Sequence, residues 1–203
     1  MKKLGFSLLA LFMLVSVGMT QAQNNSNFGV KAGLNFNKYI TDTEFADIES
    51  LTGFHVGVFY TIESNNFRIQ PGLEFVQRGS KVIPKLVPVT VKQTLNYIDI
   101  PLDCSYKIAD LNGTAIRLNV SPRLGFCLSG NNKAGGEKES IKIGGDEDSD
   151  DVKGVDFGVK FGGSVQFGQI EPYVGYDLGL VNISNGGDEV KNGSFYLGVA
   201  FHL

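Results

Sequence analysis

The sequence contains no tryptophan, only two cysteines and only two histidines among its 203 residues. Two cysteines cannot build the disulfide framework of a small secreted domain. The formal net charge is −3, so no basic field points to a nucleic acid as a partner. After the N-terminal segment no long apolar run recurs, which leaves no candidate transmembrane helix in the rest of the chain. Glycine and phenylalanine are abundant instead, with 26 and 15 residues, in a chain long enough for one domain with a sizeable core.

The first residues predict export from the cytoplasm. Lys2 and Lys3 precede the apolar segment LGFSLLALFMLVSVG, and small residues follow at Thr20 and Ala22. This order is typical of a secretory signal peptide, which we expect over residues 1–22, with the mature domain over residues 23–203. No cysteine follows the apolar segment, which argues against a lipoprotein. An uncleaved anchor is the alternative, disfavoured because the segment is short for a membrane-spanning helix.

The mature chain has the period of β-strands. In VDFGVKFGGSVQFG, residues 155–168, valine and phenylalanine fall on alternate positions, and successive side chains of a strand leave opposite faces. The same alternation predicts eight strands, at residues 28–38, 54–63, 67–78, 95–108, 114–128, 155–167, 170–182 and 194–203. An even number of antiparallel strands can close into a barrel with both chain ends at the same end.

Short and long connections alternate between these strands. SNN, DLNG and GQ join the second strand to the third, the fourth to the fifth and the sixth to the seventh, and their composition is typical of tight turns. The other connections have about 11 to 26 residues. This arrangement places every tight turn at one end of a barrel and every long loop at the other, as in outer-membrane barrels. The sequence therefore predicts an all-β fold, an eight-stranded antiparallel up-and-down transmembrane β-barrel.

The two faces of the predicted strands differ in chemistry. One face is apolar, as in Phe54, Val56 and Val58 of the second strand, and we expect no charged residue on it. The opposite face carries Lys31, Arg68, Glu74, Arg78, Asp99, Asp103, Lys107, Arg117, Arg123, Asp156, Lys160, Glu171 and Asp177. Glycines such as Gly125 and Gly158 lie between these charges.

The glycines indicate which face is inside. In a soluble barrel the polar face would meet water, where interior glycines only weaken a sheet. Inside a narrow barrel they leave room for long charged side chains to cross and pair. We therefore predict that the apolar face meets lipid and that the charges form an ion-pair network in the lumen. Pro71, Pro122 and Pro172 fall on the apolar face, where each removes a ladder hydrogen bond, so we expect bulges, strand ends or a shifted register there.

Four blocks carry a family resemblance: IQPGLEFVQRG, YIDIPLDCSYKI, DFGVKFGGSVQFG and YDLGLVNIS. With them the mature chain resembles the outer-membrane β-barrel domain family common in Bacteroidota, the PorT-like or "porin family" proteins. Asp99, before Ile100 and Pro101, fits the acidic position of the family's central block. The resemblance implies the barrel architecture and a location in the outer membrane of a Gram-negative bacterium, but no activity. The ending FHL departs from the terminal aromatic residue that such barrels use in assembly.

The segment DEDSDD, residues 146–151, is the weak candidate for a metal site. Asp146, Asp148 and Asp150 alternate as at the start of an EF-hand loop. The positions that should hold Gly and Glu hold Asp151 and Phe157 instead. A solvated loop is the favoured interpretation, and weak Ca²⁺ binding, alone or bridging lipid phosphates, is the alternative. We expect no cofactor.

Three further features have competing interpretations. His55 and His202 lie on the polar face, but no serine is obviously paired with them, so we expect no enzyme activity. Cys104 and Cys127 fall in opposite registers of neighbouring strands, which argues against a disulfide. The segment GSKVIPKLVPVTVKQ, residues 79–93, either extends a hairpin above the membrane or docks a partner or lipopolysaccharide phosphates.

The sequence thus predicts a small barrel with a structural or interaction role, which displays four extracellular loops over a lumen filled by side chains. The expected partners are outer-membrane lipid and lipopolysaccharide, the outer-membrane assembly machinery and an unknown partner at the loops, and no nucleic acid. One alternative is a narrow passive porin-like channel. Another is a soluble periplasmic ligand-binding barrel.

Overall fold

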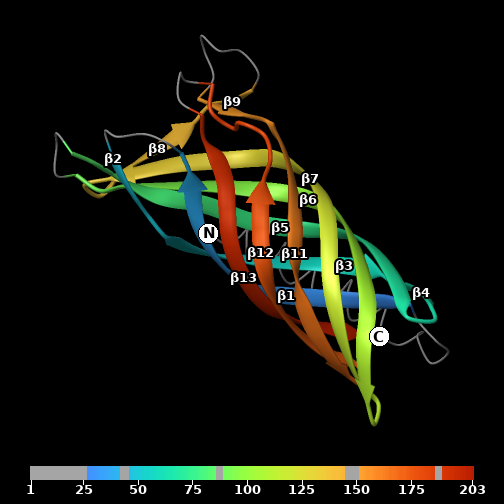
Figure 1. Ribbon diagram of the computed structural model, residues 1–203. Helices are drawn as coiled ribbons and strands as arrows, with labels where there is room; N and C mark the ends of the chain where they lie inside the picture. Colours follow the sequence, from blue (N-terminus) through green and yellow to red (C-terminus); the bar gives the residue numbers. More distant parts are fainter. Residues whose placement is uncertain (1–26, 42–45, 86–88, 145–150, 186–188) are drawn as a thin grey trace, which may run out of the picture.

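The computed structural model describes residues 27–41, 46–85, 89–144, 151–185 and 189–203 (Figure 1). Eight strands form the wall: β1 (Phe28–Ile40), β3 (Leu51–Tyr60), β5 (Phe67–Pro84), β6 (Val91–Leu111), β7 (Thr114–Ala134), β11 (Val155–Phe167), β12 (Ile170–Gly179) and β13 (Lys191–His202). The shorter strands are β2 (Ala46–Glu49), β4 (Ile62–Ser64), β8 (Glu137–Ile141), β9 (Ile143–Gly144) and β10 (Val152–Lys153). None of the described residues forms a helix long and apolar enough to span a bilayer. The predicted signal peptide lies outside the described residues.

Hydrogen bonding closes the wall into a ring. Each wall strand pairs antiparallel with the next one along the chain, β7 pairs with β11, and β13 returns to pair with β1. The closing register runs from Gly29 opposite His202 to Ile40 opposite Lys191. The prediction of an eight-stranded antiparallel up-and-down barrel is confirmed. A closed ring leaves no unpaired edge in the wall, which is the condition for placing strands in lipid.

Three tight turns lie at one end of the barrel, which we call the turn end. The hairpins close between Ser64 and Phe67, between Leu111 and Thr114, and between Phe167 and Ile170. Each turn holds a residue with positive φ: Asn65 at 55°, Asn112 at 53° with Gly113 at 88°, and Gly168 at 59°. Asparagine and glycine tolerate this conformation better than other residues, so the predicted tight turns are confirmed.

Three wall strands run past the ring at the opposite end, which we call the loop end. β5, β6 and β7 have 18, 21 and 21 residues, whereas the other wall strands have 10 to 13. β2 pairs with the end of β5 and β8 with the end of β7, so a sheet in the order β2-β5-β6-β7-β8 stands beyond the ring (Figure 1). We call it the flap, made of residues 46–49, 79–84, 91–96, 129–134 and 137–141.

The flap changes three of the predicted strand ends. The expectation that residues 79–93 extend a hairpin is confirmed, because Val82 pairs with Val91. The predicted boundaries at residues 78, 95 and 128 are wrong, since β5 continues to Pro84, β6 begins at Val91 and β7 continues to Ala134. β-Branched residues such as Val82, Ile83 and Val91 favour the extended ladder.

The prolines leave the register unchanged. Pro71 stands opposite Leu102, and pairing of β5 with β6 resumes at Glu74 opposite Asp99. Around Pro122 the pairing of β6 with β7 is likewise interrupted, while Pro172 stands opposite Val199. The register shifts between β6 and β7 lie elsewhere, next to Asn96 and Lys107. The prolines therefore remain on the outer face, where each interrupts its ladder only locally.

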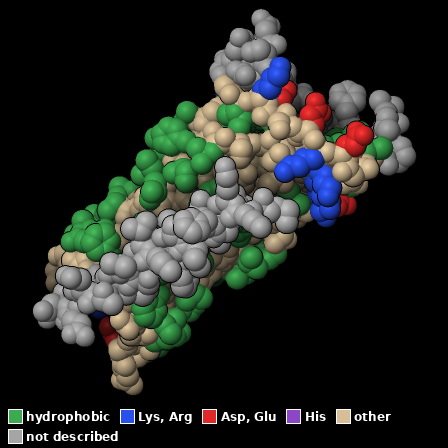
Figure 2. All heavy atoms as spheres, turned by 180° about the vertical axis from the view of Figure 1, so that it is seen from behind, with side chains coloured by type: hydrophobic (Ala, Val, Ile, Leu, Met, Phe, Trp, Pro, Cys, Tyr) green, Lys and Arg blue, Asp and Glu red, His purple; other side chains and the backbone are tan. Residues whose placement is uncertain are grey.

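The outer face of the wall is apolar. On β3, Phe54, Val56 and Val58 are 45 to 48% exposed, whereas His55 and Phe59, at positions of the opposite face, are at most 5% exposed. On β6, apolar outer side chains continue at alternate positions from Ile98 to Ile108. At about 3.4 Å per residue and a tilt of about 45°, the ten steps from the first to the last of these residues span about 24 Å of height, close to the ~25 Å band of outer-membrane barrels. Figure 2 shows hydrophobic side chains spread over the wall.

Within the predicted strands, one charged residue interrupts the outer face. Lys38 is exposed on the outer side of β1, between the inward-facing Asn37 and Tyr39. The expectation of an uncharged outer face is wrong at this position. Lys38 lies near the loop end of its strand, where a long side chain can place its ammonium at the polar border of the membrane.

Candidate functional site in the barrel lumen

The upper ion cluster lies in the lumen toward the loop end and consists of Arg78, Asp99, Arg123, Asp156 and Asp177. Arg78 binds both carboxylate oxygens of Asp99, with Nη1–Oδ1 at 3.0 Å and Nη2–Oδ2 at 2.6 Å, and its Nη2 lies 2.8 Å from Asp177 Oδ2. Arg123 donates from Nε to Asp177 Oδ1 at 2.6 Å and from Nη1 to Asp156 Oδ2 at 2.9 Å. All five side chains are at most 5% exposed. Asp177 therefore links the two arginines into one buried network.

The middle ion cluster lies one level below and consists of Lys31, Glu74, Asp103 and Lys160. Glu74 accepts from Lys31 and from Lys160, the latter at 2.7 Å between Nζ and Oε2. Lys31 also reaches Asp103 Oδ2 at 2.8 Å. Two ammonium groups and two carboxylates make this cluster formally neutral.

The lower ion cluster lies toward the turn end and consists of Arg68, Glu171 and His202. Arg68 binds Glu171 with both terminal nitrogens, at 2.9 Å from Nη1 and 2.5 Å from Nη2. His202 Nε2 lies 2.6 Å from Glu171 Oε2. Arg68 also donates to Gln166 Oε1 at 3.0 Å and to Ser105 Oγ at 3.1 Å. Uncharged side chains thus complete the donor and acceptor pattern around the pair.

Two of the predicted lumen residues pair at the turn end, apart from the three clusters. Arg117 donates to Glu63 Oε1 at 2.5 Å, and Glu63 is 37% exposed. Lys107 pairs with Asp110 at 3.3 Å beside the turn at Gly113. The Gly113 N–H and then the Lys107 ammonium stabilise the carboxylate, which lowers the pKa of Asp110. Asp110 and Glu63 were not among the predicted lumen residues, although Glu63 falls on the alternate positions of its predicted strand that form the polar face.

Glycines make room for the upper ion cluster. A Cβ at Gly125 would lie 2.7 Å from Asp99 Oδ1, and a Cβ at Gly158 would lie 2.7 Å from Arg123 Nη2. Both distances are shorter than real Cβ contacts allow. A larger residue at either position would therefore displace the charged groups.

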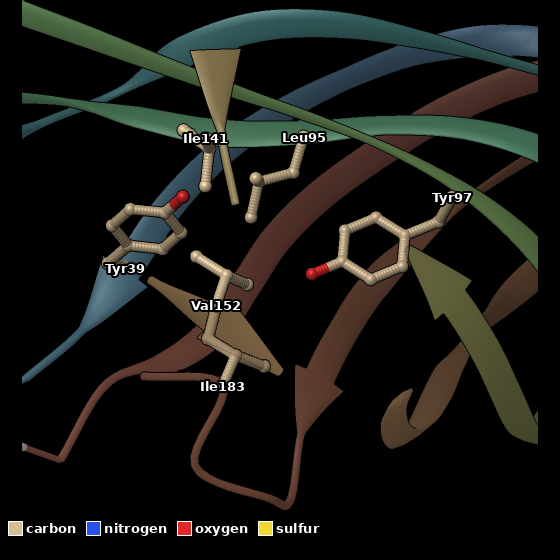
Figure 3. Packing of buried hydrophobic residues seen from close by; sticks show 6 residues of the cluster. All are labelled: Tyr39, Leu95, Tyr97, Ile141, Val152 and Ile183. Carbon is tan, nitrogen blue, oxygen red and sulfur yellow. The ribbon is translucent and has the colours of Figure 1, made fainter. Parts of the chain in front are cut away.

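An apolar cluster covers the upper ion cluster at the loop end. It consists of Tyr39, Leu95, Tyr97, Ile141, Val152 and Ile183, which converge from strands and loops far apart in the sequence (Figure 3). Leu95 and Tyr97 are fully buried, and the Arg78 guanidinium lies 5.1 Å from the centre of the Tyr97 ring. The sequence did not predict this cluster, because Ile141, Val152 and Ile183 lie outside the predicted strands. It lies beside the upper ion cluster on the side of the loops.

The space left between the clusters is small. A cavity of about 60 Å³ is lined by residues that include Lys31, Glu74, His55 and Tyr173. A water needs about 10–15 Å³ of such volume, so the cavity holds on the order of four waters. His55 is held on both sides, by Asn35 Oδ1 at 2.7 Å from Nδ1 and by the Tyr173 hydroxyl at 2.6 Å from Nε2.

The other candidate features do not assemble into a site among the described residues. His55 and His202 bond to Asn35, Tyr173 and Glu171 rather than to a serine. Cys104 and Cys127 are unpaired, and Cys127 packs against the apolar cluster while Cys104 lies on the outer side of β6. The described part of the chain contains no group of three or more metal-ligating side chains. Asp146, Asp148 and Asp150 lie outside the described residues.

The chain is similar to known outer-membrane proteins in sequence family and in fold. The sequence matches the family described as outer membrane protein beta-barrel domain over residues 21–185. Neisserial surface protein A has a TM-score of 0.50 and 16% sequence identity, over 88% of this chain and 98% of that chain. Ail, the attachment invasion locus protein of Yersinia pestis, has a TM-score of 0.47 and 14% identity, over 89% of this chain and 100% of that chain. No curated protein sequence matches significantly. At 16% identity the likeness to Neisserial surface protein A shows the fold alone.

Proposed function

Because the chain belongs to the outer membrane protein β-barrel domain family, we propose that it is a closed barrel that carries an interaction surface on the outside of the cell. The protein is an outer-membrane β-barrel of a Gram-negative bacterium. That location and the exposed apolar wall argue against the alternative of a soluble periplasmic ligand-binding barrel. What we propose is its role in that membrane. We also propose that residues 1–22 are a cleaved leader and that the protein is one of the PorT-like proteins of Bacteroidota.

The observation that carries this proposal is the filling of the lumen. Three ion clusters occupy successive levels of the barrel, and the apolar cluster covers them. A solute that crossed would have to separate pairs such as Arg78 and Asp99, and an uncompensated buried charge costs about 3–5 kcal/mol. A closed lumen favours a structural or interaction role over the alternative of a narrow passive channel.

The bonds of the two histidines support a role without catalysis. A general base must lie within hydrogen-bond reach of the group that it deprotonates. His55 bonds to Asn35 and Tyr173, and the Nε2 of His202 lies against the Glu171 carboxylate beside Arg68. Neither histidine forms a hydrogen bond with a serine among the described residues, so we propose that the protein is not an enzyme.

The flap supports a role outside the cell. In outer-membrane barrels the tight turns face the periplasm and the long connections face outward. By that rule the flap, the apolar cluster and the β9–β10 pair stand on the cell surface. We propose this assembly as the surface for an external partner. The outer-membrane assembly machinery is a second proposed partner, because β13 and β1 must pair to close the ring.

Epitope insertion tests this orientation and display. Gly135 and Gly136 form the β7–β8 turn of the flap, and Gly113 belongs to a turn at the turn end; a Cβ at any of the three would meet nothing within 4 Å. An epitope between Gly135 and Gly136 should bind antibody on intact cells, whereas the matched insertion after Gly113 should bind only after the outer membrane is opened. Antibody binding to the Gly113 insertion on intact cells would overturn the proposal.

A further inference from the structure

Four lysines stand side by side across the flap. Lys81 of β5 is opposite Lys92 of β6, Lys92 is opposite Lys133 of β7, and Lys133 is opposite Lys138 of β8. Directly opposed residues of antiparallel strands share a face, so the four form one row, which we call the lysine row. Its length is about 14 Å, since neighbouring strands lie about 4.8 Å apart. Opposed like charges destabilise a sheet, so the stability of the flap does not explain the row.

The lysine row lies on the lipid-facing side of the wall. The same face of β6 carries Thr94, Asn96 and Ile98 below Lys92, and Ile98 is the first residue of the apolar band. The intervening Leu95 and Tyr97 point inward into the apolar cluster, which fixes the alternation. Figure 2 shows Lys and Arg side chains, with Asp and Glu side chains beside them, beyond the hydrophobic band at this end of the molecule.

The lysine row stands within about one lysine side-chain length of the polar layer of the membrane. Lys92 is six residues from Ile98, which corresponds to about 14 Å of height for a strand tilted by about 45°. A lysine side chain can bend its charged end back along the surface toward the bilayer. The headgroup layer begins at the border of the apolar band and is about 5–8 Å thick in a simple bilayer. An ammonium group that bends toward the bilayer therefore reaches the outer edge of the headgroup layer.

Most of the charge in the lysine row is uncompensated by the described residues. Lys81 pairs with Glu49 of β2 at 3.5 Å. Lys92, Lys133 and Lys138 are exposed, and no carboxylate of the described ranges forms an ion pair with them. Glu137 and Glu139 alternate with Lys138 along β8, so they point to the opposite face of the flap. The ammonium groups of Lys92, Lys133 and Lys138 thus leave three uncompensated positive charges on the lipid-facing side of the flap.

We propose that the lysine row binds the phosphate groups of lipopolysaccharide in the outer leaflet. Ammonium groups bind phosphate oxygens as point charges, and basic residues next to an anionic membrane surface strengthen attachment. A lipid is the occupant because the row continues the lipid-facing wall and faces neighbouring lipids rather than the medium. The proposal rests on the outer-membrane location and does not depend on a closed lumen.

The test compares lipid retention by matched lysine variants. The full mature protein is folded into phosphatidylcholine bilayers that contain a minor fraction of bisphosphorylated lipid A. It is then extracted in mild detergent, and the retained lipid A is measured by mass spectrometry. Lys92→Gln/Lys133→Gln should retain about tenfold less lipid A than the unchanged protein, because each basic residue near an anionic surface contributes several-fold to attachment. High salt should remove the difference.

The control variant Lys142→Gln/Lys153→Gln removes the same charge beside β9 and β10 and should retain lipid A unchanged. Lys92→Arg/Lys133→Arg should also retain it, and the heat-dependent gel shift verifies that each variant is folded. Equal retention by Lys92→Gln/Lys133→Gln and the control would overturn the proposal. So would equal retention of dephosphorylated lipid A, or row-dependent binding of a soluble sulfated polysaccharide without retention of lipid A.

Discussion

Arg78 on β5 stands opposite Leu95 on β6, yet its guanidinium binds the carboxylate of Asp99, four residues farther along β6. The arginine side chain therefore runs down the lumen, and the Tyr97 ring lies above the guanidinium at 5.1 Å. Both partners of the pair are at most 1% exposed. The pair thus joins the apolar cluster above to the upper ion cluster below.

Removing Asp99 should destabilise the barrel. Asp99→Ala leaves Arg78 with Asp177 as its remaining carboxylate, and breaking a buried pair costs about 3–5 kcal/mol. Urea unfolding in detergent, followed by the gel shift between folded and unfolded bands, measures this loss. Asp110→Ala removes an exposed carboxylate of the turn end and serves as the control. A free energy of unfolding that is the same for both variants would contradict the account of the upper ion cluster.

Filling the space at Gly158 should disturb the same cluster from the other side. The new Cβ of Gly158→Ala would lie 2.7 Å from both Arg123 Nη2 and Leu178 O, and overpacking of this kind costs about 1–3 kcal/mol. The matched change Gly154→Ala meets its nearest atom at 3.8 Å and should be neutral. The same urea titration measures both, and a neutral Gly158→Ala would show that the lumen has spare room.

The free-energy cost of placing a charge on the outer wall should depend on its depth in the bilayer. Phe161 on β11 is 46% exposed on the apolar face, and Phe167 at the turn end is 47% exposed. Phe161→Arg should cost about 2–4 kcal/mol near the midplane and Phe167→Arg about 0–1 kcal/mol near the border. Unfolding free energies measured in phospholipid vesicles test this order. Equal costs at the two positions would mean that the wall is not arranged across a bilayer as described.

Truncating the apolar cluster should loosen the loop end without opening the ring. Ile183 is 2% exposed, its N–H donates to Val190 O at 2.8 Å, and its carbonyl accepts from Lys153 N–H at 2.9 Å. Ile183→Ala should cost about 2–4 kcal/mol of local stability and should accelerate trypsin cleavage after Lys153, because local opening exposes that bond. Val181→Ala, at a position 36% exposed, is the control. Equal cleavage rates would show that the cluster does not hold this segment.

The sequence predicted the ring and the lumen assignment of the charges, because the direction of a strand side chain depends only on local alternation. It did not predict the partners of those charges. Arg78 reaches Asp99 diagonally because of the stagger between β5 and β6 and the length of the arginine side chain. The apolar cluster was missed because Val152 and Ile183 come from segments without alternation. The flap was underestimated for a related reason. Where a strand extends beyond the lipid, polar residues such as Asn96 occupy its outer face. The alternation of apolar residues, from which the strand was predicted, therefore stops before the strand does.

The most direct test of the closed barrel is the electrical conductance of planar bilayers that contain the purified, folded protein. An eight-stranded barrel has an interior just wide enough for side chains to fill, and here the three ion clusters and the apolar cluster fill it. We expect no steady single-channel current, under conditions in which a general porin conducts. Reproducible current steps whose ion selectivity changes in Asp99→Asn or Arg123→Gln would contradict the closed lumen and establish a channel.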